Sequence, residues 1–411
     1  MSTEALRIKI ARLSARLAEL AAVGGTPDGG VCRLALTESD RAGRDLVVGW
    51  MRELGMTISI DQIGNVMATL AGENEGPPVT MGSHIDTVAT GGAYDGNLGV
   101  LAGLEVVQCL VDAGITPRHP VAVGFFTNEE GARFAPDMMG SGVQQGALSL
   151  QESLDTVGID GTTVRDDLAA IGYAGDAPCA FRARAFLELH IEQGPVLEQE
   201  GDVIGAVTGV QGISWTEVTL HGVSNHAGTT PMNMRKDAAF VAAEIAVELR
   251  KIASDIGAPQ VSTVGFLKLE PNLINVVARK ATMTLDLRHT DEAVLKGAEA
   301  RAFAFVNEAA AREGLTVEMR TLARFEPVSF DAGIVDLVAR KAKDLGHTAR
   351  RMPSGAGHDA QMFAPNCPSG MIFVPSAGGI SHNIREHTDA EHIEVGANIL
   401  LQALLELACS S

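Results

Sequence analysis

The sequence is short of basic residues and of paired cysteines, and each shortage excludes a class of protein. Lys and Arg number 32 against 51 Asp and Glu, which gives a net charge of −19. Binding to nucleic acid requires clustered Lys and Arg, so neither nucleic acid nor an anionic membrane is expected as a partner. The five cysteines are odd in number and include no CxxC pair, which favours reduced thiols in the cytoplasm.

Long apolar runs are also missing. No apolar run approaches the length that spans a bilayer, so no membrane segment is expected. Near the N-terminus, apolar residues recur at alternating spacings of four and three, which predicts an amphipathic helix rather than the apolar core of a signal peptide. These residues are Leu6, Ile10, Leu13, Leu17 and Leu20.

Several enzyme motifs are absent as well. The sequence contains no GxxxxGK[ST] phosphate loop and no GxGxxG after a strand, which argues against nucleotide and dinucleotide enzymes. It also lacks the GxSxG motif of serine hydrolases of the α/β type. The chemistry must therefore come from other residues.

The chain of 411 residues is too long for a typical single domain, and its pattern changes twice. Residues 1–211 alternate strand and helix patterns, which predicts an α/β fold with a mostly parallel sheet flanked by helices. Residues 212–328, with one strand expected over 261–270, follow the β-α-β-β-α-β order of a ferredoxin-like α+β domain. The α/β pattern resumes over 329–411, so the smaller domain is an insertion.

Polar residues follow three of the predicted strands. The stretch "GSHIDTVATGGAYDGNLGV" at residues 82–100 places His84 and Asp95 beyond an apolar strand pattern. The acidic pair Glu129–Glu130 and His190 end two further strand patterns. Because sites collect beyond the carboxyl ends of parallel strands, these side chains are expected to meet.

The residue types favour two divalent metal ions. Three imidazoles and two carboxylates suit Zn, Mn, Co or Ni, which accept nitrogen and oxygen ligands. Asp95 lies on a glycine-rich turn, where one short carboxylate can face both ions. The candidate ligands are His84, Asp95, Glu130, His190 and His382.

Two nearby acids suggest further roles. Asp86 lies two residues from His84 and is suited to accept its second ring N–H. Of Glu129 and Glu130, one can bind metal while the other takes and returns the proton of a water that the metal has made acidic. The alternative is that these residues are only structural. A lone histidine near a strand end is often hydrogen-bonded within the core, and an adjacent acidic pair is usually solvated at the surface. Their joint occurrence at strand ends favours a site.

Several motifs occur in one order through most of the chain: "GSHIDT", "NEEGARF", "HIEQGPVLE", "HAGTTPM", "GAGHDA" and "GISHN". Together they resemble the amidase, hydantoinase and carbamoylase branch of the M20 metallopeptidase superfamily. That branch includes N-carbamoyl-L-amino acid hydrolases, allantoate amidohydrolases and β-ureidopropionases. The resemblance implies that residues 212–328 form a lid and dimerisation domain, and hence that the protein is a homodimer.

The resemblance also implies a role for each matching residue. Three residues would bind one metal ion (His84, Asp95 and His190) and three the other (Asp95, Glu130 and His382). Glu129 becomes the general base, and His226 of the lid steadies the developing oxyanion. Gln193, Asn275 and Arg288 match substrate contacts, with Arg288 holding the substrate carboxylate. From the residues alone, Arg288 also fits an exposed strand position, and Gln193 and Asn275 also fit turns.

The expected function is metal-dependent hydrolysis of the carbamoyl group of N-carbamoyl-L-amino acids to amino acid, CO2 and ammonia. Allantoate and β-ureidopropionate are alternative substrates, because all three offer a carboxylate and a ureido group. A peptidase is a further alternative, although peptidases of the superfamily commonly have an acid where this chain has His190. From another class, the alternative is a non-catalytic small-molecule binding protein on the same scaffold.

Overall fold

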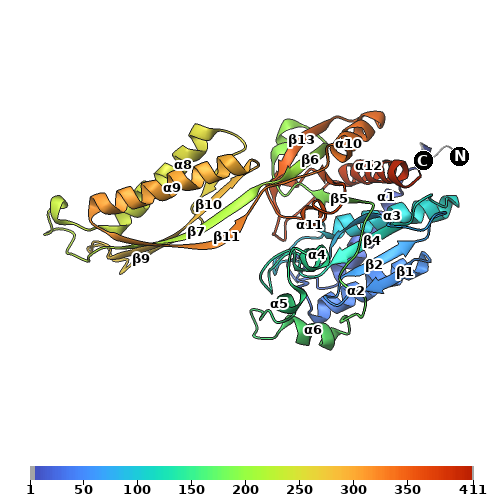
Figure 1. Cartoon of the computed structure of the whole chain (residues 1–411), viewed down its shortest axis with the longest axis horizontal. Helices are drawn as coiled ribbons and strands as arrows, with labels where there is room; N and C mark the ends of the chain where they lie inside the picture. Colours follow the sequence, from blue (N-terminus) through green and yellow to red (C-terminus); the bar gives the residue numbers. More distant parts are fainter. Residues whose placement is uncertain (1–4, 410–411) are drawn as a thin grey trace. The chain divides into compact units, whose positions relative to one another are not determined.

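The structure is a computed structural model that describes residues 5–409. The chain divides into two compact units (Figure 1). Unit 1 comprises the chain up to Gly209 and again from Ser329, and unit 2 comprises Val210–Val328. The expected N-terminal helix is present as α1 (Ile10–Ala22), and Leu6 of the expected pattern lies before its first residue.

A nine-stranded sheet forms the centre of unit 1, in the order β1-β2-β4-β3-β5-β14-β6-β12 with β13 beside β6. Its strands are β1 (Thr57–Ile60), β2 (Val66–Leu70), β3 (Val79–His84), β4 (Val121–Phe126), β5 (Ala185–Ile191), β6 (Ile204–Val210), β12 (Val328–Ser329), β13 (Ala349–Ser354) and β14 (Ser369–Val374).

The pairing within this sheet is mixed. Parallel pairing joins β4 to β3, β3 to β5 and β5 to β14. The pairs β1–β2, β2–β4 and β14–β6 are antiparallel. The α/β class is confirmed, but the expected mostly parallel order is confined to the middle of the sheet, because β2 and β6 join that middle in the antiparallel sense.

Helices cover the sheet of unit 1 (Figure 1). Helices α1, α3 and α12 pack against one another, and α3 is buried along most of its length because nearly all of its residues are apolar or glycine. Besides α1, the helices are α2 (Glu38–Glu53), α3 (Asn97–Ala113), α4 (Met139–Gln144), α5 (Leu150–Leu154), α6 (Val164–Ile171), α7 (Val196–Glu200), α10 (Ala332–Asp344), α11 (Asp359–Phe363) and α12 (Ala390–Cys409).

Helix α12 corrects one expectation from the sequence. It is long and apolar enough to cross a membrane by length and composition, although no apolar run was expected to be. Of its most apolar window, 67% is buried inside the structure, where it packs against α3, β5 and β14. A mostly buried core helix meets the same criteria, so the length of α12 is weak support for a membrane span.

Unit 2 is an antiparallel sheet in the order β11-β7-β10-β8, with β9 also paired to β10. Helices α8 and α9 lie together on one face of this sheet (Figure 1). Burial alternates along β10, because every second side chain packs under the helices. The elements are β7 (Gly212–His221), α8 (Ala238–Ile256), β8 (Val261–Thr263), β9 (Leu267–Glu270), β10 (Lys280–His289), α9 (Glu292–Glu313) and β11 (Thr316–Phe325).

The single strand expected over 261–270 is wrong, since the segment forms two strands. Thr263 pairs with Asp286 and Leu267 with Met283, so β8 and β9 together carry one more residue than the facing part of β10. Gly265 lies in this irregular part. An extra residue of this kind interrupts the ladder as a β-bulge does.

Candidate metal centre

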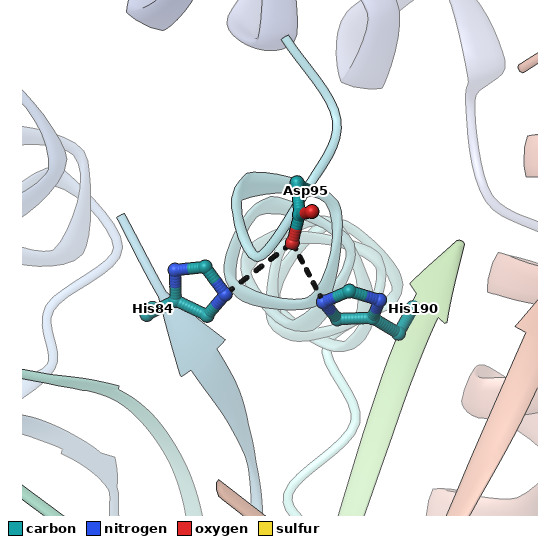
Figure 2. Close-up of side chains that lie close together, drawn as sticks. All are labelled: His84, Asp95 and His190. Carbon is teal, nitrogen blue, oxygen red and sulfur yellow. Dashed lines mark ion pairs between the residues drawn. The ribbon is translucent and has the colours of Figure 1, made fainter. Parts of the chain in front are cut away.

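His84, Asp95 and His190 meet at the carboxyl ends of two neighbouring strands (Figure 2). His84 ends β3, and His190 lies near the end of β5, which pairs with β3 in parallel. Asp95 comes from the turn before α3, and its Oδ1 lies 3.5 Å from Nε2 of His84 and 3.2 Å from Nε2 of His190. All three side chains are buried.

Asp95 presents its second oxygen to another group. Its Oδ2 lies 3.5 Å from Nε2 of His382, and the same nitrogen lies 3.2 Å from Oε2 of Glu130. Glu130 follows β4 and His382 follows β14. One carboxylate therefore faces two sets of nitrogen and oxygen donors, with one oxygen toward each set.

A glycine makes this close approach possible. Gly96, next to Asp95, has φ +66°, and a Cβ there would lie 2.4 Å from Nε2 of His84. Glycine alone avoids both the steric clash and the cost of the left-handed region. The backbone N–H of Gly96 also donates to Nε2 of His190 at 3.2 Å.

Backbone carbonyls orient the two buried imidazoles. Nδ1 of His84 donates to the carbonyl of Asp86 at 2.9 Å, and Nδ1 of His190 donates to the carbonyl of Ile191 at 2.8 Å. In a neutral ring with the proton on Nδ1, Nε2 keeps its lone pair, which is the form that binds metal. Both Nε2 atoms are directed toward Asp95.

The expected partner of His84 is therefore wrong in one respect. The Asp86 carboxylate lies 3.9 Å from Nδ1 of His84, beyond hydrogen-bond distance, and its backbone carbonyl takes that place. The carboxylate instead accepts the backbone N–H groups of Glu129 at 3.2 Å and Glu130 at 3.3 Å. Asp86 thus holds the turn that carries the acidic pair.

The charges at this centre favour a cation. Burial raises the pKa of Glu129 well above its usual range, and the neighbouring acids Asp359 and Glu130 add to the rise. Burial likewise raises the pKa of Asp86 to about 6. For His84, burial lowers the pKa, but the charge of Glu129 and the hydrogen bond with Asp95 outweigh it, and the pKa is raised well above its usual value. A divalent cation would offset this excess of buried negative charge, so the donors present fit a metal.

Glu386 joins the two loops that carry Asp95 and His382, and sequence reasoning missed it. Its Oε1 accepts the backbone N–H groups of Tyr94 at 2.9 Å and Asp95 at 3.1 Å, while Ser381 donates to its Oε2 at 3.3 Å. Burial and then the charge of Asp95 raise its pKa to about 7. Its position four residues after His382, inside the same loop, was the signal that could have found it.

Arg33 was also missed. It is fully buried, and its guanidinium donates to the carbonyl of Ile85 at 2.7 Å and to Oδ1 of Asn97 at 2.7 Å. Ile85 stands between His84 and Asp86, and Asn97 is two residues from Asp95. Arg33 thus fixes both segments of the centre, but its partners are backbone or distant groups that no local motif records.

Gln193 lies against the same carboxylate. Its Nε2 donates to Oδ2 of Asp95 at 2.8 Å, and its backbone N–H donates to Ser376 at 2.9 Å. Its φ of 60° is unusual for a residue other than glycine. The side chain amide is thus held beside Asp95 in unit 1.

The remaining expected residues belong to unit 2. His226 pairs with Val276 as an isolated β-bridge, and the N–H of Ala227 donates to the carbonyl of Asn275 at 2.9 Å, so His226 and Asn275 lie on adjoining segments. Nδ1 of His226 accepts the backbone N–H groups of Gly228 at 3.1 Å and Thr229 at 3.2 Å. In the neutral ring the proton is therefore on Nε2.

Arg288 lies elsewhere in unit 2. It stands near the end of β10, opposite Ile213 of β7. Its guanidinium contacts the carboxylate of Asp286 at 2.9 Å and lies over the Trp215 ring at 5.6 Å from the ring centroid. Arg288 and the His226–Asn275 pair are thus at different ends of the same sheet.

An α/β unit with imidazoles and carboxylates gathered at its strand ends is characteristic of metal-dependent hydrolases. The model of Peptidase family M20/M25/M40 matches residues 80–406, and the chain belongs to that family. Within it, the expected placement in the amidase, hydantoinase and carbamoylase branch is confirmed, and the chain is a hydrolase.

The relatives support this placement over nearly the whole chain. An N-carbamoyl-L-amino-acid amidohydrolase of Rhizobium meliloti is 40% identical over 98% of this chain and 97% of its own. An allantoate amidohydrolase of Bacillus subtilis is 35% identical over 95% of both chains. The crystal structure of an amidase of the hydantoinase/carbamoylase family from Burkholderia multivorans has a TM-score of 0.96 at 45% identity, covering 98% of this chain and 99% of its own.

Proposed function

We propose that the protein is a metal-dependent amidohydrolase that releases amino acid, CO2 and ammonia from N-carbamoyl-L-amino acids. The observation that carries the proposal is the Asp95 carboxylate, which faces one donor set with each oxygen. His84, Asp95 and His190 would hold one divalent ion, and Asp95, Glu130 and His382 a second. Zn, Mn, Co and Ni all suit these ligands.

Bound there, the ions would polarise the carbamoyl oxygen and supply an acidified water. Glu129 is the proton carrier of this proposal. Its Oε2 lies 3.3 Å from Nε2 of His84, and its burial raises its pKa well above the usual range. A carboxyl at this place can take a proton and return it. Asp86 holds its backbone in place.

His226 supports the developing oxyanion in this proposal. Its Nδ1 is occupied by two backbone donors, so its Nε2 carries a proton that it can donate. The ring is exposed and free to meet a substrate. Asn275, on the adjoining segment, adds a side-chain amide to the same end of unit 2.

The neighbours of Arg288 favour a carbamoyl amino acid over allantoate. Ile213 faces Arg288 across β7 and β10, and Phe325 faces Ile213 across β7 and β11, so all three side chains share one face of the sheet. Trp215 lies against the guanidinium, which is paired with Asp286, so apolar side chains flank this charged pair. An apolar amino-acid side chain fits there better than the second ureido group of allantoate, which needs polar partners.

The arrangement of unit 2 supports a homodimer in which two chains complete each site. Lys280 and Arg288 are eight residues apart on β10, which corresponds to about 26 Å, and His226 lies beyond the Lys280 end. One small substrate cannot touch both Arg288 and His226 of the same chain. If both contact it, then one of them comes from a second copy, and residues 212–328 act as lid and dimerisation domain.

The test is ammonia release by metal-loaded protein from N-carbamoyl-L-methionine, allantoate and β-ureidopropionate, with ninhydrin detection of dipeptide cleavage. The proposal expects the highest kcat/KM for the carbamoyl amino acid. Faster turnover of allantoate would favour the alternative of an allantoate amidohydrolase, and dipeptide cleavage would favour a peptidase. Binding without turnover of any of them would indicate a non-catalytic protein.

We also place the protein in the cytoplasm, because all five cysteines are free.

A further inference from the structure

Unit 2 carries His226 in a short exposed turn, and the side chain of Arg235 is bonded to the backbone of that turn. The turn runs from His226 to Thr230, and the N–H of Thr230 closes it by donating to the carbonyl of His226 at 3.2 Å. His226, Gly228 and Thr229 are exposed. Because water can replace each hydrogen bond of an exposed turn, these bonds alone fix the turn only weakly.

The guanidinium of Arg235 holds two carbonyl groups of this turn. Its Nη2 donates to the carbonyl of Ala227 at 2.6 Å, and its Nε donates to the carbonyl of Thr230 at 3.1 Å. The guanidinium is planar, so its donors keep a fixed spacing and little freedom is lost for each bond formed. Arg235 therefore restrains both ends of the segment 227–230 at once.

One peptide group connects Arg235 to the ring of His226. The carbonyl of Ala227 and the N–H of Gly228 belong to the same peptide, and that N–H donates to Nδ1 of His226 at 3.1 Å. A cation at the carbonyl polarises the peptide and makes its N–H a stronger donor. The bond from Arg235 thus favours the ring form in which Nδ1 has no proton and Nε2 carries one.

We propose that Arg235 is the positioning residue of His226, which fixes the turn and, through the peptide between Ala227 and Gly228, keeps the proton of the neutral ring on Nε2. Its guanidinium acts on the ring rather than on the substrate. The inference rests on the proposed function in one respect, which is that Nε2 of His226 donates to the developing oxyanion. The effect on the ring itself involves no substrate.

Nitrogen-15 NMR of the imidazole rings tests the positioning without a substrate. Zn-loaded protein with labelled histidine is suitable because Zn²⁺ is a closed-shell ion, and the signals absent from His226→Ala belong to His226. At a pH where the ring is neutral, wild type should show a proton on Nε2 and none on Nδ1. Arg235→Ala should move both signals toward the average of the two tautomers. Unchanged signals in Arg235→Ala would overturn the positioning role.

Two further variants define what Arg235 supplies. Arg235→Lys keeps the charge but not the pair of fixed donors, so it should restore part of the wild-type difference between the two nitrogen signals. Arg279→Ala is the matched control, because Arg279 directly precedes β10 at the same end of unit 2 and pairs with Glu270 at 3.2 Å. This control should keep the wild-type signals.

Kinetics with N-carbamoyl-L-methionine tests whether the positioning serves turnover. Arg235→Ala should lower kcat by about 10–100-fold, less than the loss of the oxyanion donor itself, and should change KM little. In the His226→Ala background the same substitution should have no further effect, because its action requires the ring. Arg279→Ala should keep the wild-type kcat. Losses that multiply in the double variant would show that Arg235 acts by another route and would overturn the link to His226.

The two measurements separate this inference from the proposed function. If the protein hydrolyses no carbamoyl amino acid, the proposed function fails, and the nitrogen signals still decide whether Arg235 positions the ring. If His226→Ala is nearly inactive while the His226 signals of wild type and Arg235→Ala coincide, the proposed function stands and the positioning inference fails.

Discussion

The two units set up the same side chain in opposite ways. In unit 1, Nδ1 of His84 and of His190 donates to a backbone carbonyl, which leaves Nε2 as an electron-pair donor. In unit 2, Nδ1 of His226 accepts two backbone N–H groups, which leaves Nε2 as a proton donor. The backbone around each ring thus decides whether a histidine suits a metal ion or a developing oxyanion.

The imidazole rings of the two units also differ in burial. His84 and His190 are about 1% exposed, and their partners come from strand ends that the sheet holds in place. His226 is exposed, and side chains near it in sequence are also exposed and apolar, with Met232 at 76% and Met234 at 69%. A rigid, buried arrangement of imidazoles suits metal ligation. Exposed apolar side chains near His226 instead suit contact with a substrate or with another protein surface.

Removal of metal should have the largest effect. We expect chelation to reduce ammonia release to background and Mn, Co, Ni or Zn to restore it. Asp95→Ala should lose both ions, because each donor set uses one oxygen of this carboxylate. His226→Ala, in unit 2, should bind the same ions as wild type. Full activity of exhaustively metal-free protein would remove the metal centre from the mechanism.

The two adjacent glutamates should differ next. Glu129→Gln is expected to keep both ions and to lose about 10²–10⁴-fold in kcat, since the amide cannot accept a proton. Glu130→Gln should instead weaken the binding of one ion, because Glu130 lies with His382 in the second donor set. Metal content by elemental analysis, alongside kcat, separates the two. Two ions in Glu130→Gln and fewer in Glu129→Gln would reverse the assignment.

The sequence predicted the donors better than it predicted their supports. His84, Glu130 and His190 end apolar strand patterns, so a rule about parallel strands brings them to one edge without a structure. Glu386 binds backbone groups of a loop 292 residues earlier in the chain. Arg33 likewise depends on carbonyls that any residue could supply. Contacts to backbone leave no pattern in the partner's sequence.

The fold shows the same limit. Strand β13 (Ala349–Ser354) was not predicted, because its sequence ARRMPS is half polar and contains proline. Its side-by-side pairing with β6 comes from the tertiary structure rather than from local propensity. The role of Asp86 was misjudged for a related reason, since its carboxylate and its own carbonyl compete for nearby donors and only the geometry decides.

Substitution of His226 should sharpen the comparison between the rings. His226→Ala is expected to lower kcat by about 10²–10³-fold, the usual cost of one oxyanion donor. His226→Gln should recover part of this loss, because its amide N–H can replace the proton on Nε2. His84→Gln should recover little relative to His84→Ala, because an amide carbonyl oxygen is a weaker ligand for these ions than the imidazole nitrogen that it replaces. Equal recovery at both positions would contradict the opposite tautomers.

The His226→Ala variant also tests which chain of a dimer supplies His226 to an active site. Glu129→Ala and His226→Ala should each be nearly inactive. If His226 acts on the partner, then a mixed dimer has one site with both lesions and one with neither, and co-refolded mutants regain part of the wild-type rate. Mixed dimers shown to have formed, but without recovered activity, would place His226 in the site of its own chain.

Substitution of Glu386 should give the smallest effect and should fall on metal affinity. Glu386→Ala removes the acceptor for the N–H groups of Tyr94 and Asp95, so Asp95 loses the support that aims it, and metal affinity should fall about 10–100-fold. Glu386→Gln keeps one oxygen for those donors and should lose less. Asp389→Ala is the control and should bind metal as wild type does, because Asp389 is an exposed acid of the same loop that pairs with His387 at 3.1 Å.

A lower metal affinity could come from a misplaced Asp95 or from a less stable fold. Titration of metal-free protein with Zn, together with thermal unfolding of the metal-free forms, distinguishes these two reasons. If Glu386 positions Asp95, the alanine and glutamine variants differ in metal affinity while their metal-free unfolding temperatures stay close. If both variants bind Zn as tightly as wild type, the hydrogen bonds of Glu386 do not help to position Asp95. The rigid placement of the metal ligands in unit 1 would then have another origin.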